Sequence, residues 1–454
     1  MNAPFVPPRP PVAPPDAELA DFLVAARRNA LKMWSAAAYE QDAVIDRALG
    51  RAWLLLNAPE AIQHVLVDNP AGYRRTPASI RILRPITGRG LLLTEGEEWR
   101  WQRRTTAPAL APRSLKLLVP HMAGAAQAAL PGLRQQAATG TVDLLAAVQA
   151  LTLDIAARSM FSLGTEGFGP VLRAQLDRYG ERLAQPTALD MLLPVSVPSP
   201  RDVRRFFFRR RFVRLMDAVV ATRAAAPPPD APRDLFDLLR AARDPDTGAG
   251  FSPAQLRDQI TTLMVAGHET TALALFWALY LLANSPAVQD SVAAEVAGVD
   301  LGPEAAGESL PRLKLTAAVV NEALRLFPPA FTMVRQARAD DRAGGIAIPR
   351  GAVVMIAPWV LHRHRRLWEA PDAFRPERFL PGAPPPPRFA YLPFGAGPRV
   401  CVGAQFALME ATLVLATLVQ AFRIAMASTR PVLPAPVVTT QPDHAPDFRL
   451  LRRD

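Results

Sequence analysis

The deciding stretch of this sequence reads Phe394-Gly395-Ala396-Gly397-Pro398-Arg399-Val400-Cys401-Val402-Gly403, and it contains the only cysteine among 454 residues. A thiolate is a strong ligand for soft metals, and one thiolate suffices as the protein ligand of an iron already held by four ring nitrogens. The apolar run from Ala404 onward predicts a helix. Cys401 is therefore expected at a helix start, where free backbone N–H groups stabilise an anionic sulfur.

The residues around this cysteine suit a flat ligand that carries negative charge. Gly395, Gly397 and Gly403 allow tight turns and a close approach, and Arg399 can meet an anionic group. For a cysteine alone, a small hydrophobe packed after a Gly/Pro turn is the commoner outcome. The complete spacing Phe-x-x-Gly-x-Arg-x-Cys-x-Gly, however, resembles the haem-binding loop of the cytochrome P450 family. The resemblance implies that Cys401 is the iron ligand of haem b. The further cofactor contacts that it implies are Phe394, Gly395, Arg399 and Gly403.

Composition limits the class of protein and its partners. The net charge is 52 − 41 = +11, and half of the residues are hydrophobic, as in a globular protein. A basic surface attracts nucleic acid, anionic lipid or an acidic protein, but no nucleic-acid motif occurs. Residues 1–15 contain seven prolines and no apolar run, so they predict neither a signal peptide nor a transmembrane anchor. We expect a cytoplasmic protein that does not bind nucleic acid.

The chain predicts a proline-rich arm over residues 1–15 and one domain over 16–454, mainly α with a small β subdomain. Helical periodicity runs from Asp16 to Ala38, and Pro59–Asp68 predicts a short helix. The segment Tyr73–Thr94 lacks a clear period and predicts a loop with apolar side chains. Strands are predicted at Arg51–Leu56, Ile346–Ile348 and Val353–Ala357.

A helix is predicted over Glu95–Leu110, where Trp99 and Arg103 lie four residues apart and share a face. An indole N–H and a guanidinium on one face can clamp a carboxylate, although cation–π packing is the commoner reason for such a pair. The segment resembles the helix that contacts haem in the same family. Trp99 and Arg103 are therefore expected at the haem propionates, and Arg335 falls where the family places another propionate contact.

Seven arginines surround Phe206-Phe207-Phe208 in the stretch Arg201–Arg214. A basic amphipathic helix of this kind can lie on a membrane. The commoner explanation is a solvated charged face with the aromatic rings turned inward, and this is the expectation here.

A long helix is predicted from Ser252-Pro253, as cap and first helical residue, to about Ala283. Within it, small Ala266-Gly267 leave room beside the backbone, and the polar pair Glu269-Thr270 follows. Buried hydroxyls that bond back to the preceding turn are the alternative explanation of this cluster. The segment Ala-Gly-x-Glu-Thr-Thr resembles the oxygen-activation motif of the family. This implies that Ala266 and Gly267 flank the haem, that Thr270 donates a hydrogen bond near dioxygen, and that Glu269 is its acidic partner; His268 receives no role.

Glu322 and Arg325, three apart on a predicted helix over Leu310–Phe327, resemble the Glu-x-x-Arg pair of the family. Their implied role is structural, in contact with Arg378. His362 and His364 lack an evident third ligand, so structural roles are expected for them as well.

Taken together, the resemblances imply a haem-thiolate monooxygenase of cytochrome P450 fold. It would use O2 and NAD(P)H electrons, delivered by a separate ferredoxin or flavodoxin-type donor with its reductase, to hydroxylate a small apolar lipid, terpenoid or aromatic compound. Arg81 or Arg84 is a weaker candidate for anchoring a substrate carboxylate. The expected substrate lining is apolar and comprises Ile80, Ile82, Ile86, Leu263, Phe331, Met333 and Val438.

Three alternatives remain open at this point. A peroxide-driven enzyme would need no redox partner, and a haem-thiolate isomerase or dehydratase would consume no oxygen. A haem-binding sensor or carrier would show no turnover at all. The Glu269-Thr270 pair argues against the first and the last, because both lack a need for proton delivery to dioxygen.

Overall fold

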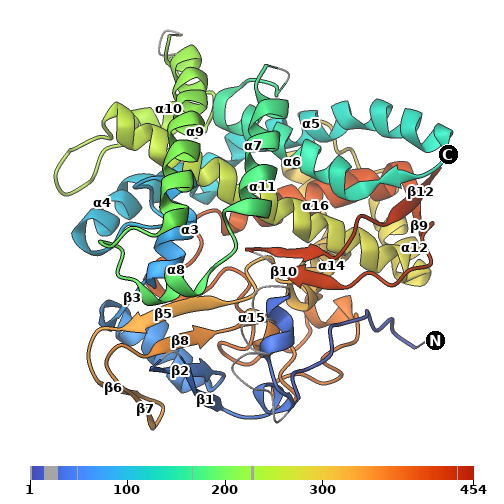
Figure 1. Ribbon diagram of the computed structural model, residues 1–454. Helices are drawn as coiled ribbons and strands as arrows, with labels where there is room; N and C mark the ends of the chain where they lie inside the picture. Colours follow the sequence, from blue (N-terminus) through green and yellow to red (C-terminus); the bar gives the residue numbers. More distant parts are fainter. Residues whose placement is uncertain are drawn as a thin grey trace.

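The structure is a computed structural model that describes residues 3–14, 29–48, 50–165, 167–225, 230–436 and 438–453. Helices form most of it, and the main sheet lies at one edge of the helical part (Figure 1). The predicted mainly α fold with a small β region is confirmed. The described part of the arm has no helix and lies against the body, where the Phe5 carbonyl accepts a hydrogen bond of 2.8 Å from the Phe374 N–H.

Helix α11 (Pro253–Ala283) runs through the centre and packs against helices from three parts of the chain: α6, α14 and α16. The longer helices around it are α5 (Pro112–Thr139), α6 (Leu144–Phe161), α7 (Gly169–Arg182), α9 (Pro200–Ala224), α14 (Lys314–Leu326) and α16 (Ala404–Ala421). The shorter ones are α2 (Pro59–Gln63), α3 (Pro77–Thr87), α4 (Gly96–Thr106), α8 (Ala188–Leu192), α10 (Leu235–Ala241), α12 (Pro286–Val296), α13 (Ala306–Ser309) and α15 (Pro358–Leu361).

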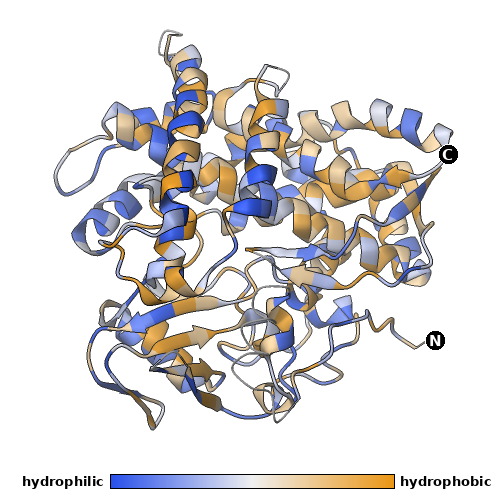
Figure 2. Cartoon of the chain, in the orientation of Figure 1, coloured by the Kyte–Doolittle hydropathy of each residue, from blue (hydrophilic) through white to orange (hydrophobic). Residues whose placement is uncertain are grey.

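The start of α11 is the one predicted from the sequence. The Ser252 hydroxyl accepts a hydrogen bond from the Gln255 N–H, and the Gln255 side chain accepts one from the Ser252 N–H, which satisfies two free donors of the first turn. Residues 271–282 are all buried, which explains why this half of the helix is apolar on every side. Orange interior helices in Figure 2 contrast with the largely blue surface helix α9.

Among the described residues, three helices, α6, α11 and α16, are long and apolar enough to cross a membrane by length and composition. Within their most apolar windows, 61%, 72% and 56% of the residues are buried inside the protein itself. Packing in the core therefore accounts for much of their apolar composition.

The main sheet has the order β1-β2-β8-β5-β3. Its strands are β1 (Ala43–Ala48), β2 (Arg51–Leu56), β3 (Tyr73–Arg74), β5 (Met333–Ala337) and β8 (Val353–Ile356). Among the described strands of this sheet, the β2–β8 pair alone is parallel, with Trp53 opposite Val353. The smaller sheets pair β6 (Asp341–Ala343) with β7 (Ile346–Ile348), β10 (Pro434–Pro436) with β11 (Thr440–Pro442), and β12 (Asp447–Arg452) with both β4 (Val142–Asp143) and β9 (Phe422–Met426).

Two local predictions near the N-terminus are wrong where the structure tests them. The predicted loop Tyr73–Thr94 contains α3, because Thr76 caps the helix and Pro77 starts it, while Pro85 is accommodated inside rather than ending it. Of the predicted helix Asp16–Ala38, the part up to residue 28 lies outside the described residues. The rest forms two short 3₁₀ helices, separated by the extended residues Trp34 and Ser35.

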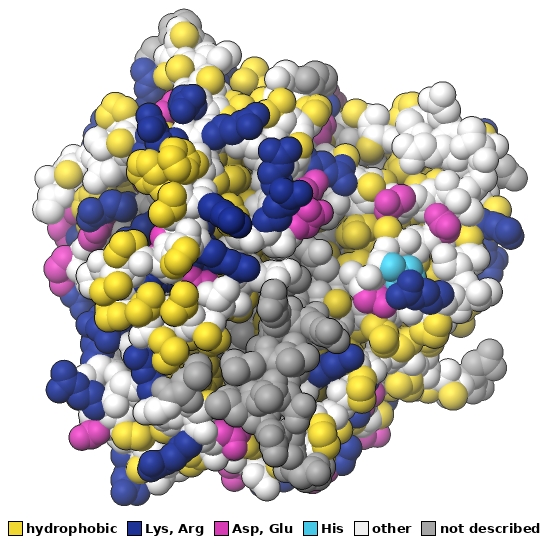
Figure 3. All heavy atoms as spheres, viewed as in Figure 1, with side chains coloured by type: hydrophobic (Ala, Val, Ile, Leu, Met, Phe, Trp, Pro, Cys, Tyr) yellow, Lys and Arg dark blue, Asp and Glu magenta, His cyan; other side chains and the backbone are white. Residues whose placement is uncertain are grey.

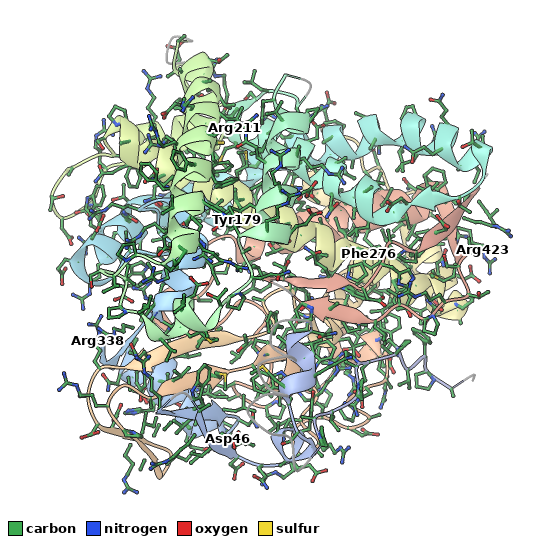
Figure 4. All side chains as sticks on the ribbon, viewed as in Figure 1. Asp46, Tyr179, Arg211, Phe276, Arg338 and Arg423 are labelled. Atoms are coloured by element: carbon green, nitrogen blue, oxygen red, sulfur yellow. The ribbon has the colours of Figure 1, made fainter. Side chains whose placement is uncertain are left out.

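The aromatic triplet of α9 does not turn inward as a whole. Phe208 is partly buried and packs on Tyr179, which Figure 4 shows beside α7, with ring centroids 4.5 Å apart. Phe206 and Phe207 remain 57% and 61% exposed, so the expectation of inward rings is wrong for these two. Consecutive helical residues are rotated by about 100°, so three in a row cannot all face one core.

The Glu322–Arg325 pair has the structural contacts predicted for it. Both side chains are fully buried, and two bonds of 2.7 Å join the guanidinium to the carboxylate. Arg325 also donates to the carbonyl oxygens of His362 at 2.8 Å and Ala373 at 3.0 Å, and Arg378 lies 3.5 Å from Glu322. The pair thus ties α14 to the segment that precedes the cysteine loop.

His362 extends this network to Leu392, in the segment just before the cysteine loop. Its Nε2 accepts a hydrogen bond of 2.8 Å from the Leu392 N–H, and its Nδ1 lies 3.1 Å from the Arg325 carbonyl oxygen. The ring must therefore be neutral, with the proton on Nδ1. Burial, reinforced by the Arg325 charge, lowers the pKa of His362 to about 3.

We expect this neutral histidine to make the fold acid-sensitive. In the unfolded chain His362 is protonated below about pH 6.5, its ordinary pKa. In the folded chain its pKa is about 3, so it stays neutral until the pH falls to that value. The contribution of His362 to the free energy of unfolding is therefore fully present above pH 6.5. It decreases by about 1.4 kcal/mol per pH unit as the pH falls from 6.5 toward 3. Urea unfolding at several pH values gives the free energy of unfolding as a function of pH. This free energy should depend less steeply on pH in His362→Gln than in the wild type, because glutamine can keep both hydrogen bonds but does not titrate. An unchanged slope would contradict the assignment.

Candidate active site

A cavity of about 680 Å³ lies between α11, α16 and the cysteine loop, and it extends to α3, α6 and α8. Its walls include eleven of the twelve residues predicted for the site: Trp99, Arg103, Ala266, Gly267, Thr270, Arg335, Phe394, Gly395, Arg399, Cys401 and Gly403. The twelfth, Glu269, is not among the lining residues. The fold therefore brings together segments more than 300 residues apart in the chain.

The cysteine loop depends on glycine at one position for its shape. Gly397 has φ +70°, and a Cβ at this residue would lie 1.9 Å from the Leu66 carbonyl oxygen. A larger residue there would push the loop away from the π-helical turn His64–Asp68. The loop closes through a hydrogen bond of 2.9 Å from the Cys401 N–H to the Phe394 carbonyl oxygen, and α16 starts three residues later.

The Cys401 thiol faces the cavity. Its side chain is exposed, and the exposure is to the cavity that it lines rather than to the outer surface. Burial raises the pKa of the Cys401 thiol, while the Gly403 N–H and the Arg103 charge oppose this effect. Arg103 is held by a bond of 2.9 Å to the Val400 carbonyl oxygen. The sulfur is thus presented to the cavity with a donor and a cation beside it that favour its anionic form.

Three arginines crowd the cavity wall beside this loop: Arg75, Arg335 and Arg399. Burial, reinforced by the charges of the other two, lowers the pKa of Arg75 to about 9. Burial and the Arg335 charge likewise lower the pKa of Arg399 to about 10. Arg75 Nε and Arg399 Nη1 are buried and have no hydrogen-bond partner within the described part of the chain.

The nearby acid, Glu95, offsets only part of the positive charge of this cluster. Glu95 accepts a hydrogen bond of 2.7 Å from the Arg75 backbone N–H and one of 2.9 Å from Arg338 at the molecular edge (Figure 4). Trp99 covers the outer side, with the Arg399 guanidinium carbon 4.4 Å from its ring centroid. The site therefore holds surplus positive charge and unsatisfied donors that an anionic ligand would complete.

These observations fit haem. The arginine cluster suits two propionate carboxylates, and the single thiolate suits the iron. At Gly267 and Gly403, an added Cβ would meet no atom of the described residues within 4 Å, so packing of the protein does not explain why glycine stands there. Both line the cavity and leave room in it for a flat ring.

Arg75 was missed by the sequence reasoning, which assigned the segment around it to a loop. The available signal was an arginine, Arg75, directly before the helix-start pattern Thr76-Pro77. Nothing in the local sequence indicates that this arginine meets Arg335 and Arg399. Arg75 and Arg335 come together because β3 pairs with β5 in the main sheet, with Arg74 opposite Gln336, and the cysteine loop brings Arg399 beside them.

The structure separates the side chains of Thr270 and Glu269. Thr270 faces the cavity, and its hydroxyl donates a bond of 2.6 Å to the Ala266 carbonyl oxygen. Glu269 instead accepts hydrogen bonds from Thr439 at 2.7 Å and Gln441 at 2.9 Å. His268 is buried against α6 with its Nε2 3.0 Å from the Gln149 carbonyl oxygen, and burial lowers its pKa to about 4. The implied partnership of Glu269 and Thr270 remains a prediction.

A second carboxyl lines the cavity and was not singled out in the sequence. Glu410 on α16 is 2% exposed, and burial raises its pKa well above the usual range, which favours the neutral carboxyl. The nearby Thr271 hydroxyl acts in the opposite direction and lowers the pKa of Glu410. Among the described residues, this hydroxyl has no hydrogen-bond partner at ordinary distance. A glutamate inside an otherwise apolar helical run was the signal that marked it.

The substrate end of the cavity is largely apolar. Of the seven residues expected there, Ile82, Leu263, Phe331, Met333 and Val438 line it, whereas Ile80 and Ile86 do not. Arg81 is buried and engaged by Asp202 and by the Pro194 carbonyl oxygen at 2.6 Å, so it is not free to anchor a carboxylate. Arg84 is exposed and does not line the cavity.

Comparison with known proteins places this geometry in a family. A model of cytochrome P450 matches residues 43–444. Cyclooctatin synthase of Streptomyces melanosporofaciens is 33% identical over 427 residues, covering 91% of this chain and 89% of that protein. Cyclooctat-9-en-7-ol 5-monooxygenase of the same organism is 31% identical over 380 residues, covering 82% and 80%. Cytokinin hydroxylase of Arabidopsis thaliana is 32% identical over 405 residues, covering 86% and 77%. The chain belongs to the cytochrome P450 family.

Proposed function

We propose that this P450 monooxygenase hydroxylates a small, mainly apolar organic substrate with electrons from a separate ferredoxin or flavodoxin-type protein and its reductase. The observation that carries the proposal is the Cys401 thiol at the floor of a cavity whose wall holds an unneutralised arginine cluster. Two relatives named as a monooxygenase and a hydroxylase support the reaction class.

Haem, when bound through a thiolate, supplies the activation of dioxygen. The chain's own residues do the rest. Arg75, Arg335 and Arg399 bind the propionates, and Arg103 with the Gly403 N–H stabilises the Cys401 sulfur as an anion. Apolar side chains from α3, α6 and α11 exclude water and hold the substrate by its shape.

We assign proton supply to Thr270 and Glu269 of α11. The Thr270 hydroxyl faces the cavity and can turn from the Ala266 carbonyl oxygen to a water molecule or to dioxygen. Glu269 accepts hydrogen bonds from Thr439 and Gln441 and does not line the cavity, so a proton would pass from it to Thr270 through water. The cavity-facing hydroxyl supports Thr270 as the last protein donor, and the Ala-Gly-x-Glu-Thr-Thr motif supports Glu269 as its acid.

The electron donor and the cellular location belong to the same proposal. A net charge of +11 suits an acidic redox protein, since opposite charges accelerate docking. Arg100 is exposed on α4, the helix that also carries Arg103. We place the enzyme in the cytoplasm, where ferredoxins, flavodoxins and NAD(P)H are found.

The test is the variant Thr270→Ala, compared with Thr270→Ser, which keeps a hydroxyl. We expect Thr270→Ala to bind haem and to consume NAD(P)H and oxygen, but to form about tenfold less product per NAD(P)H and to release hydrogen peroxide. Thr270→Ser should stay close to the wild type. Unchanged product per NAD(P)H in Thr270→Ala would remove the proposed role.

The alternatives give different outcomes in the same assay. Full turnover by the wild type with hydrogen peroxide and without NAD(P)H would indicate a peroxide-driven enzyme. Substrate conversion without oxygen consumption would indicate an isomerase or dehydratase. A protein that binds haem but converts no substrate with any reductant would be a sensor or carrier.

A further inference from the structure

One carboxylate binds the segment of chain that lies against the cysteine loop. Asp341, at the start of β6, accepts hydrogen bonds from His64 Nε2 at 2.9 Å, from Asn69 Nδ2 at 3.0 Å and from the Tyr73 hydroxyl at 2.8 Å. The three donors belong to residues 64–73, whereas Asp341 comes 268 to 277 residues later. The carboxylate therefore connects two distant parts of the chain.

The Asp341 carboxylate serves this segment rather than the surface charges around it. Dark-blue basic side chains stand out at the lower left of Figure 3, where Figure 1 places β6 and β7. Asp341 nevertheless pairs with no arginine within the described residues, and its side chain is only 21% exposed. Burial would raise its pKa, but hydrogen bonds from His64, Tyr73, the Arg342 N–H and Asn69 together lower the pKa to about 2. The acceptor is therefore a charged carboxylate at neutral pH.

The three donors surround an unusual turn. Residues His64–Asp68 form a π-helical turn, which closes where the Asn69 N–H donates a hydrogen bond of 2.8 Å to the His64 carbonyl oxygen. Such turns are rare and need support from their surroundings. Asp341 binds the first residue of the turn, the residue that follows it, and Tyr73 at the start of β3. Both ends of the π turn are thus fixed by one side chain.

The π turn packs on the backbone of the cysteine loop. The carbonyl group of Leu66, at the centre of the turn, approaches Gly397 so closely that no Cβ would fit there. Val65 and Leu66 are buried in a hydrophobic cluster against which Ala396 also packs, and all three line the cavity. Cys401 follows Gly397 by four residues. Because a close-packed interior transmits displacements, a shift of the turn would reach the sulfur through this loop.

We propose that Asp341 is a positioning residue for the Cys401 sulfur. By fixing both ends of the π turn, it sets the place of the Leu66 carbonyl group, and this contact sets the path of the cysteine loop. Asp341 does not line the cavity, so it acts through the turn rather than on the sulfur itself. The inference rests on the thiolate ligation of haem in the proposed function, and neither the substrate nor the electron donor enters it.

The experiment compares the full-length, haem-loaded wild type with Asp341→Ala and Asp341→Asn. Each protein is reduced, saturated with carbon monoxide and held at one temperature below its unfolding midpoint, while the red-shifted Soret band of thiolate ligation is followed. We expect Asp341→Ala to lose this band about tenfold faster than the wild type, because three donors lose their acceptor and the turn can shift. Asp341→Asn keeps an oxygen in the same place, so its rate should stay within about twofold of the wild type.

A milder variant keeps the inference testable where Asp341→Ala does not fold. Tyr73→Phe removes one of the three donors and leaves the buried ring in its hydrophobic cluster. We expect this variant to lose the band about threefold faster than the wild type. An unchanged rate in Tyr73→Phe, together with failure of Asp341→Ala to fold, would overturn the inference.

The matched control is Asp443→Ala. The Asp443 side chain is 23% exposed, lies 2.7 Å from His444 Nδ1, and accepts hydrogen bonds of 3.0 Å from Arg430 and from the Leu433 N–H. It thus resembles Asp341 in exposure and in its partners, but none of these partners belongs to the cysteine loop. Urea unfolding should show Asp443→Ala to be less stable than the wild type, whereas its Soret band should persist as long as that of the wild type.

The outcomes separate positioning of the sulfur from general stability. Equal band lifetimes in Asp341→Ala and the wild type would overturn the inference. Equally fast loss of the band in Asp341→Ala and Asp443→Ala would overturn it as well, since any loss of stability would then suffice. A wild type that binds haem without the red-shifted band would overturn both this inference and the thiolate ligation on which it rests, so the two failures are distinguishable.

Discussion

Replacing Cys401 by alanine should abolish the thiolate-type spectrum and all oxygenase activity. The chain has no other cysteine, so no second sulfur can take over the iron. In the reduced, carbon-monoxide-bound wild type we expect the red-shifted Soret band of thiolate ligation, and in Cys401→Ala we expect its complete loss. The thiol faces the cavity rather than the core, so the fold should survive, and unfolding midpoints should stay close to those of the wild type.

Cys401→His separates loss of the ligand from loss of the pocket. An imidazole can still bind iron, so this variant should keep haem and colour while lacking the red-shifted band and the oxygen chemistry that thiolate donation supports. A Cys401→Ala protein that retained the thiolate band would contradict the assignment. So would a wild-type protein that binds haem without showing that band.

Replacing Arg325 by alanine should lower the free energy of unfolding by about 3–5 kcal/mol, because it leaves the Glu322 carboxylate buried with less than full compensation. Three carbonyl oxygens, of His362, Pro371 and Ala373, would lose their donor in the same step. Urea unfolding followed by circular dichroism measures the effect. Haem content measured beside it shows whether the cysteine loop is disturbed.

The matched control is Arg100→Ala on α4. Arg100 also pairs with an acid three residues away, Glu97, but both side chains are exposed. Water screens such a pair, so its loss should cost about 1 kcal/mol or less. If Arg325→Ala and Arg100→Ala lowered the free energy of unfolding by similar amounts, burial of the Glu322–Arg325 pair would contribute nothing to the stability of the fold.

Much of the fold follows from short patterns whose physics is local. The Ser252-Pro253 start of α11 depends on donors within one turn, and the strand Arg51–Leu56 on a short apolar run. Helix α3 was missed for a local reason as well, because its segment shows no clear helical period, and it also contains Pro85, which usually ends a helix. Here the helix continues around the proline, since Thr76 caps its start and α3 packs against α9 and α11.

How the two catalytic candidates on α11 lie relative to each other depends on contacts with distant segments. Glu269 and Thr270 are adjacent in sequence, but a helix turns about 100° per residue, so one reaches Thr439 and Gln441 and the other faces the cavity. No spacing in the sequence reveals that the β10–β11 segment lies on the side of α11 that Glu269 faces.

By itself, the sequence determined the family and the Glu322–Arg325 pair and predicted Cys401 as the iron ligand, since each is written in residues a few positions apart. Only the tertiary structure decided that Arg75 joins Arg335 and Arg399, because this requires strand β3 to pair with β5. It also decided that Phe206 and Phe207 face outward, because the inner side of α9 is already filled by Arg205, Phe208 and Phe212. Which side of a helix is covered depends on its neighbours, and those neighbours come from elsewhere in the chain.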